Sequence, residues 1–192
     1  MIQTKKPKSI FDMRSFKTEG IVIRRRNIGE ADRLLTIFTK ESGKIRIKAP
    51  GVRKITSRRS SHVELLNLSV LTLYKSSRSV VPILTEAQTV HDFDFIKQDL
   101  RRIGFAFYIC ELVDRLCPDN QENRRIFYLL RDTFEKLGSL SCEAVVNEFE
   151  EKALSFLGFM PYEYLLKDRQ AFMEKVLEKK LRTAEMLPLF ID

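Results

Sequence analysis

Cations crowded between residues 44 and 62 are the strongest chemical feature of this sequence. The stretch KIRIKAPGVRKITSRRSSH contains seven Lys and Arg side chains and no Asp or Glu. Guanidinium groups bind phosphate oxygens through paired hydrogen bonds, and ammonium groups bind them as point charges. Such a surface attracts a polyanion by releasing its condensed counterions, whatever the base sequence. We therefore predict a phosphate-binding surface, with a merely solvated loop as the alternative.

The candidate set for this surface also includes three arginines that precede the stretch and one tyrosine that could stack on bases. Its members are Arg24, Arg25, Arg26, Lys44, Arg46, Lys48, Arg53, Lys54, Arg58, Arg59 and Tyr74. We expect these cations to converge in space into one continuous track.

Groups suited to catalysis are sparse. Glu30 and Asp32 could act as acid and base, but they lie among arginines, which favours a local salt-bridge role. The two histidines, His62 and His91, are isolated. No metalloprotease, serine-hydrolase or P-loop motif occurs, and no spacing of Cys, His or carboxylates predicts a metal site. We expect no catalytic residue, metal or cofactor.

Composition limits the class of protein. The chain has 192 residues, of which 44% are hydrophobic, enough to fill a core. No apolar run approaches the ~20 residues of a transmembrane helix. The N-terminus lacks the apolar segment of a secretory signal, so we expect a cytoplasmic protein with no membrane association. Cys110, Cys117 and Cys142 have no CxxC spacing and fall on apolar faces, which predicts buried thiols.

The net charge of +8 is unevenly distributed along the chain. Residues 1–90 carry 19 Lys and Arg against 7 Asp and Glu, whereas residues 91–192 carry 15 against 19. This asymmetry favours two modules with different partners, of which only the first would attract a polyanion.

Short apolar runs between turn residues predict a five-stranded barrel in the first half. We expect strands over residues 20–26, 33–40, 44–50, 63–76 and 79–90, with a positive φ at Gly29 and a tight hairpin at 41–43. In the third strand, period two separates Ile45, Ile47 and Ala49 from Lys44, Arg46 and Lys48. Phe38 is expected in the core, and residues 1–15 as a flexible basic arm.

Beyond residue 92 the apolar period becomes helical and predicts a bundle. We expect one helix from an Asp94 cap to Pro118, a second closing at Gly138, a third from Ser141 to Gly158, and a last one around residues 172–181. The fold class is therefore α+β, a barrel followed by helices.

Several segments occur in an order that resembles the RecO family, bacterial recombination-mediator proteins of DNA repair. They are TEGIVIRRRNIGEADRLLTIFTKESGKIRIKAPGVRK (18–54), FAFYICELVDRL (105–116), FEEKALSFLGFMP (149–161) and, more faintly, KKLRTAEML (179–187). The resemblance covers about residues 16–162.

The resemblance implies an oligonucleotide-binding (OB) barrel over residues 16–92 and a helical domain over 93–192. It implies binding of single- and double-stranded DNA, annealing of complementary strands, and help in loading recombinase onto DNA covered by single-stranded-DNA-binding protein. Implied partners are RecR and the acidic C-terminal tail of that binding protein. The implied location is the bacterial cytoplasm, in association with the nucleoid.

One region departs from the family pattern. Many members carry two CxxC pairs after the Leu-Gly-aromatic-x-Pro segment, where this sequence has YEYLLKDRQAF (162–172) without cysteine. The structural zinc of those members is therefore predicted absent, and the C-terminal domain shorter.

An acidic, apolar-ended tail would require an apolar groove with a basic rim. The candidates for that rim are Arg101, Arg102, Arg124, Arg125 and Arg131, although charged helix surfaces are usually solvated. An RNA- or ribosome-binding barrel would explain the basic half equally well, but not the helical half. A phosphotransfer or nuclease enzyme would need a metal or nucleophile that the sequence does not provide.

Overall fold

A closed five-stranded barrel forms the first half of the molecule. The computed structural model describes residues 15–75, 79–159, 181 and 183. The strands are β1 (Ser15–Ile28), β2 (Asp32–Thr39), β3 (Gly43–Ala49), β4 (Leu68–Tyr74) and β5 (Ile83–His91). They close in the order β1-β2-β3-β5-β4, with only the β3–β5 pair parallel. The predicted five-stranded OB barrel is confirmed.

Alternation of side chains fills the barrel as the sequence predicts. In β3, Ile45, Ile47 and Ala49 are buried inside, while Arg46 points outward. Phe38 is fully buried, which confirms its place in the core. Gly29 has a φ of +53°, so the turn between β1 and β2 has the predicted left-handed residue.

The first strand is longer than predicted and the fourth is shorter. β1 bends at a bulge between Val22 and Arg24, and this bend lets it pair with β4 at one end and β2 at the other. β4 begins at Leu68 because the preceding residues leave the extended conformation. Leu66 has a φ of +73° and its amide donates to the carbonyl of Val22. A short 3₁₀ turn, η2 (Ser61–Val63), precedes it.

Among the described residues, four helices follow the barrel: α1 (Asp94–Lys97), α2 (Leu100–Leu116), α3 (Arg124–Lys136) and α4 (Cys142–Phe156). The first predicted helix is in fact two. Asp99, rather than Asp94, accepts hydrogen bonds from the amides of Arg101 and Arg102 and so starts α2. The second and third predicted helices are confirmed as α3 and α4. All three cysteines are buried, as predicted.

The expected division at residue 92 falls in the short connection between β5 and α1. The predicted basic arm, apart from Ser15, and most of the predicted last helix lie outside the described residues. Leu181, from the end of that predicted helix, is fully buried.

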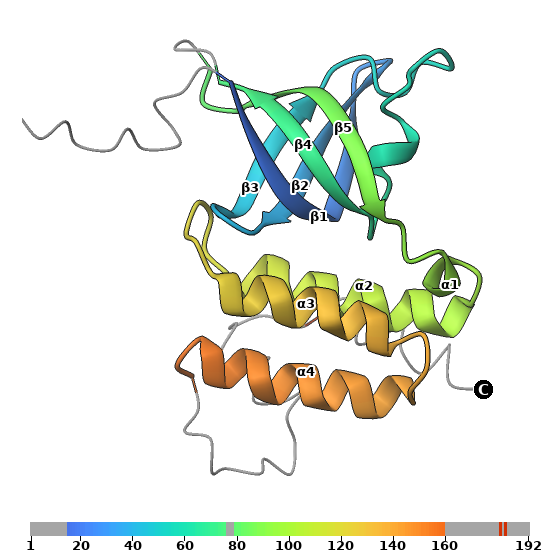
Figure 1. The fold of residues 1–192 in the computed structure, drawn as a ribbon, viewed down its shortest axis with the longest axis vertical. Helices are drawn as coiled ribbons and strands as arrows, with labels where there is room; N and C mark the ends of the chain where they lie inside the picture. The colour runs from blue at the N-terminus through green and yellow to red at the C-terminus, as the bar shows by residue number, and fades with distance from the viewer. Residues whose placement is uncertain (1–14, 76–78, 160–180, 182, 184–192) are drawn as a thin grey trace, which may run out of the picture.

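The barrel packs against the helical layer, and residues of both halves belong to one apolar cluster. Figure 1 shows α2 and α3 beneath the barrel, and α4 below them on the side away from the barrel. Ile21 and Phe38 of the barrel belong to the same apolar cluster as Phe105 and Ile109 of α2. A second cluster, which includes Ile37 and Leu71, fills the barrel itself.

The β2–β3 hairpin meets the connection between α2 and α3, and we call this contact the seam (Figure 1). Gly43 has a φ of +62°, and a Cβ placed there would lie 1.8 Å from the carbonyl oxygen of Gln121. The amide of Asn120 donates to the carbonyl of Lys44 at 2.8 Å. Only glycine permits this approach between two backbones.

We predict that Gly43→Ala lowers the free energy of unfolding by about 3 kcal/mol or more, because it adds a backbone clash to a left-handed φ. Gly29→Ala is the matched control, since Gly29 also has a positive φ but a Cβ added to it would meet nothing within 4 Å. It should cost only about 1–2 kcal/mol. Urea denaturation of both variants measures the difference, and equal losses would show that the seam contributes no steric constraint.

Candidate nucleic-acid interface

The outward-facing cations of β3 have partners that change along the strand. Lys44, next to the helices, is 6% exposed and its ammonium lies 3.2 Å from Asp119 and 3.5 Å from Asp114. Arg46 pairs with Asp119 at 3.1 Å, through the other oxygen of that carboxylate. Lys48, at the opposite end, pairs with Asp32 of β2 at 3.0 Å. The outward-facing side of β3 was predicted correctly, but the helical half covers Lys44, the first cation on that side.

Among the described residues, two of the three arginines of β1 are paired with carboxylates and the third is not. Arg24 pairs with Asp114 of α2 at 3.2 Å, and Arg25 pairs with Glu64. Arg26 is exposed and has no ion pair within the described part of the chain. The cations therefore do not form the single continuous track that the sequence predicts, because carboxylates of α2 and its following connection neutralise those nearest the helices.

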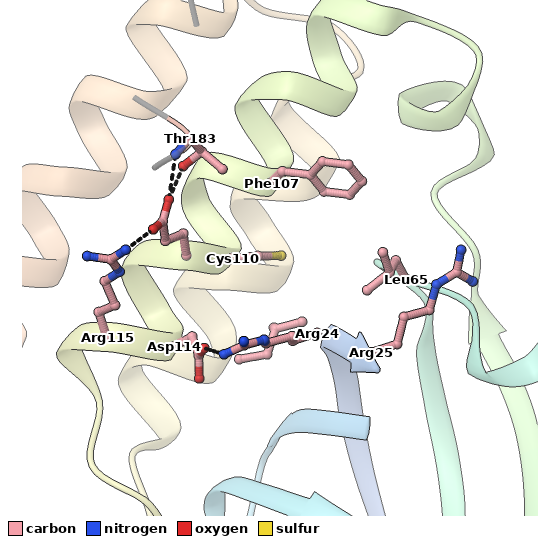
Figure 2. Close-up of a pocket in the computed structure, with 10 residues that line it drawn as sticks. Arg24, Arg25, Leu65, Phe107, Cys110, Asp114, Arg115 and Thr183 are labelled. Atoms are coloured by element: carbon pink, nitrogen blue, oxygen red, sulfur yellow. Dashed lines mark hydrogen bonds and ion pairs between the residues drawn. The ribbon is translucent and has the colours of Figure 1, made fainter. Parts of the chain in front are cut away.

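A hollow of about 700 Å³ lies beside this neutralised end, between β1 and α2. Figure 2 shows Arg24 directed at Asp114. The carboxylate of Glu111 pairs with Arg115 and accepts a hydrogen bond from the Thr183 amide. The apolar lining of the hollow comprises Ile23, Leu65, Phe107 and Cys110. Because the lining arginines Arg24, Arg25 and Arg115 are each paired with a carboxylate, this hollow offers little net attraction for a polyanion.

The remaining cations gather in the connection between β3 and η2, residues 50–60, which we call the basic loop. The loop lies at the end of the barrel away from the helices (Figure 1). Arg53, Lys54 and Arg58 are exposed and form no ion pair with any described residue, and one nitrogen of the Arg53 guanidinium donates to the Gly29 carbonyl at 3.1 Å. The loop itself contains no carboxylate. This is the largest group of cations that the described fold leaves available to a ligand.

Several hydrogen bonds hold the basic loop in place. The carboxylate of Asp32 accepts from the Gly51 amide at 2.8 Å, and the Arg53 amide donates to the Ala31 carbonyl at 2.9 Å. The guanidinium of Arg59 donates to the carbonyls of Leu84 (2.6 Å) and Pro50 (2.8 Å). Arg59 therefore ties the loop to β5, and its fork is already occupied.

Asp32 is the ion-pair partner of Lys48. The Gly51 amide and then the Lys48 ammonium hold the pKa of this carboxyl below its usual value, so it remains ionised. This confirms the salt-bridge role that the sequence favoured for Asp32.

A second hollow, of about 740 Å³, opens against the basic loop. Lys54 and Arg58 line it together with the hydroxyl residues Thr56, Ser57 and Thr85. Arg59 and Asp32 line it as well, but the Arg59 guanidinium is engaged by two backbone carbonyls and the Asp32 carboxylate is paired with Lys48. The Ser57 hydroxyl oxygen is buried and has no hydrogen-bond partner among the described residues. Cations and hydroxyl groups around one hollow are suited to an oxyanion such as phosphate.

Tyr74 is the last residue of β4 and is 38% exposed. It stands opposite Ile83, which in turn stands opposite Lys48. The tyrosine therefore lies toward the same end of the barrel as the basic loop, where it is accessible to a ligand.

The five arginines predicted to rim a groove do not surround one. Arg101 pairs with Glu143 and Arg102 with Asp99 at the start of α2. The other three lie on α3, whose first residue is at the opposite end of the helical layer in Figure 1. Arg124 pairs with Glu122 and Arg131 with Asp132. Within the described residues, Arg125 has no carboxylate partner.

Exposed aromatic rings accompany the α3 cations. Arg125 lies 5.7 Å from the ring centroid of Phe156. Arg131 and Lys40 lie 5.1 and 5.6 Å from that of Tyr128. Tyr128 lies on α3, Phe156 is the last residue of α4, and Lys40 lies in the β2–β3 hairpin. We call the group of Lys40, Arg125, Tyr128, Arg131 and Phe156 the cation–aromatic surface.

The sequence did not reveal the roles of Asp114, Asp119 and Arg59. Lys44 and Asp114 are 70 residues apart, and no local pattern marks their pairing. Among the described residues, no cluster of His, Cys, Asp and Glu is suited to hold a metal, and no helix is long and apolar enough to span a bilayer. The cysteine-free segment 162–172 lies outside those residues.

Two family models match the chain in succession. The model described as "Recombination protein O N terminal" matches residues 13–93, and that described as "Recombination protein O C terminal" matches residues 97–163. Together they cover the barrel and nearly all of the four described helices.

Relatives over the same region are named DNA repair protein RecO. The chain is 34% identical to that of Pelotomaculum thermopropionicum over 78% of its own length and 57% of the relative's. It is 38% identical to that of a Roseiflexus species, over 79% and 53%. For Dehalococcoides mccartyi the values are 37%, 76% and 57%.

The chain thus spans somewhat more than half the length of these curated relatives. The match runs from the basic barrel into the helical half, in the order that the names of the two family models give. This chain belongs to the RecO family of DNA repair proteins.

Proposed function

We propose that this chain binds single- and double-stranded DNA through the basic loop, with Arg26, Lys48 and Tyr74 beside it. The observation that carries the proposal is the separation of charges. Cations near the helices are paired with Asp114 and Asp119, whereas Arg53, Lys54 and Arg58 of the loop have no ion-pair partner in the described structure. Family membership favours DNA over the RNA or ribosome that the charge alone would equally allow.

In this proposal the chain anneals complementary strands and helps load recombinase onto DNA covered by single-stranded-DNA-binding protein. Cations on a fixed loop lower the repulsion between two phosphate backbones and leave the base edges free to pair. The ties from Asp32 and Arg59 support this role because an ordered loop loses less entropy on binding. No chemical step is required, and we propose a mediator without catalytic residues.

The proposed partners are RecR and the acidic tail of the single-stranded-DNA-binding protein. RecR rests on family membership alone. For the tail, the cation–aromatic surface on α3 provides cations for carboxylates and rings for an apolar end. Of the five arginines predicted from sequence, Arg125 and Arg131 remain in this proposal. The location would be the bacterial cytoplasm, at the nucleoid, where such partners meet.

We predict that Lys54→Ala combined with Arg58→Ala weakens single-stranded DNA binding to a similar extent for all base sequences. Loss of two phosphate contacts should reduce the slope of log K against log salt by about 1.4, since each contact contributes about 0.7. Fluorescence anisotropy with labelled oligonucleotides at several salt concentrations measures this slope.

The matched control is Arg101→Ala combined with Arg102→Ala, which removes the same formal charge from the start of α2. Its slope should equal that of the unmodified chain. Equal effects of the two pairs would mean that net charge, rather than the basic loop, drives binding. Competition with structured RNA of equal length tests the alternative partner class, and preference for the RNA would contradict the proposal.

We also predict that Arg125→Ala weakens binding of a synthetic peptide with the sequence of the tail by about fivefold, since it removes an exposed cation and its ring contact. Isothermal titration calorimetry measures the affinity, and Arg101→Ala serves as the control on the other end of the layer. A fivefold loss with Arg101→Ala and none with Arg125→Ala would place the tail elsewhere.

A further inference from the structure

Ile55 is fully exposed at the centre of the basic loop, with a relative accessibility of 105%. Its neighbours Lys54 and Thr56 are also exposed, whereas Val52 of the same loop is buried in the barrel core. The loop is therefore anchored by one aliphatic residue and presents another to solvent.

The position of Ile55 departs from ordinary turn chemistry. The Ser57 amide donates to the carbonyl of Lys54 at 2.9 Å, so Ile55 and Thr56 are the central residues of a tight turn. Gly, Pro, Asn, Asp and Ser usually occupy such positions, and β-branched residues favour strands. A residue that breaks a local rule without gaining burial is a candidate for a functional contact.

A ligand that contacts Ile55 must also be compatible with the positive charge beside it. Arg53, Lys54 and Arg58 flank Ile55 in the sequence and are exposed as it is, and no carboxylate occurs in the loop. A single DNA strand presents phosphates beside unstacked base faces, and so matches both features at once. A duplex presents the phosphates but keeps its base faces stacked, except where a side chain wedges between them.

We propose that Ile55 is a base-contacting residue, which packs against the unstacked bases of single-stranded DNA while the flanking cations hold its phosphates. This inference rests on the proposed DNA binding and adds a distinction between single and double strands. The apolar contact contributes to single-strand affinity, does not alter the salt slope, and contributes little to duplex binding.

Ile55→Trp tests the contact directly, because the chain contains no tryptophan and the variant has a single indole. Saturation with oligo-dT should quench its fluorescence strongly, while duplex DNA at saturation should quench it weakly. Leu140→Trp is the matched control, since Leu140 is also exposed (55%) but lies in the connection between α3 and α4. Its emission should not respond to either DNA.

Ile55→Ala provides the energetic counterpart. We expect single-strand affinity to fall roughly five- to tenfold, with the salt slope and the duplex affinity unchanged. A uniform loss on both DNA forms would indicate a structural role in the loop and would overturn the inference.

Three further outcomes are distinguishable. If the unmodified chain binds oligo-dT but the Ile55→Trp signal stays constant, the inference fails and the proposed function stands. If the unmodified chain binds neither DNA, both fail. If the indole responds to vesicles containing phosphatidylglycerol and not to DNA, the loop contacts an anionic lipid surface instead, and the base contact is excluded.

Discussion

The buried ammonium of Lys44 is the interaction on which the arrangement of charge depends. An ammonium removed from water must be paired and hydrogen-bonded, or it destabilises the fold. Asp114 and Asp119 meet this requirement from the helical half, together with the Asp114 carbonyl. The same two carboxylates then reach Arg24 and Arg46. Docking of the helices therefore buries Lys44 and reduces the net positive charge at this end of the barrel, where Arg24 and Arg46 stay exposed but paired.

The opposite end of the barrel has the contrary arrangement. Its cations stand on a loop that hydrogen bonds tie to neighbouring strands, and Asp32 beside them is engaged by the Gly51 amide and Lys48. The cations at the helical end of the barrel are thus paired within the molecule, whereas those of the basic loop are exposed and have no ion-pair partner among the described residues. In a family of DNA repair proteins, this division gives the proposed DNA path a location at the end of the barrel away from the helices.

The sequence predicted the features that depend on local patterns. Period two placed Ile45 and Ile47 inside the barrel, and helical periodicity located α3 and α4. Prediction from the sequence failed where a side chain is engaged by a partner that is distant in the sequence. Lys44 and Arg59 resemble phosphate ligands because nothing nearby in the sequence shows that Asp114 or the Leu84 carbonyl will occupy them. Asp99 rather than Asp94 starts the long helix, and a stretch with two acids five residues apart does not by itself show which of them accepts the amide hydrogen bonds.

Lysine acetylation followed by mass spectrometry would show which ammonium groups are available to DNA, because it reports each lysine of the folded chain with and without a single strand bound. We expect Lys54 to react in the free protein and to be protected by DNA. Lys44 should stay unreactive in both states, and Lys136 on α3 should react equally in both. A Lys44 that reacts readily and becomes protected by DNA would contradict the division of charge, because the seam would then be open and its cations would belong to the binding surface.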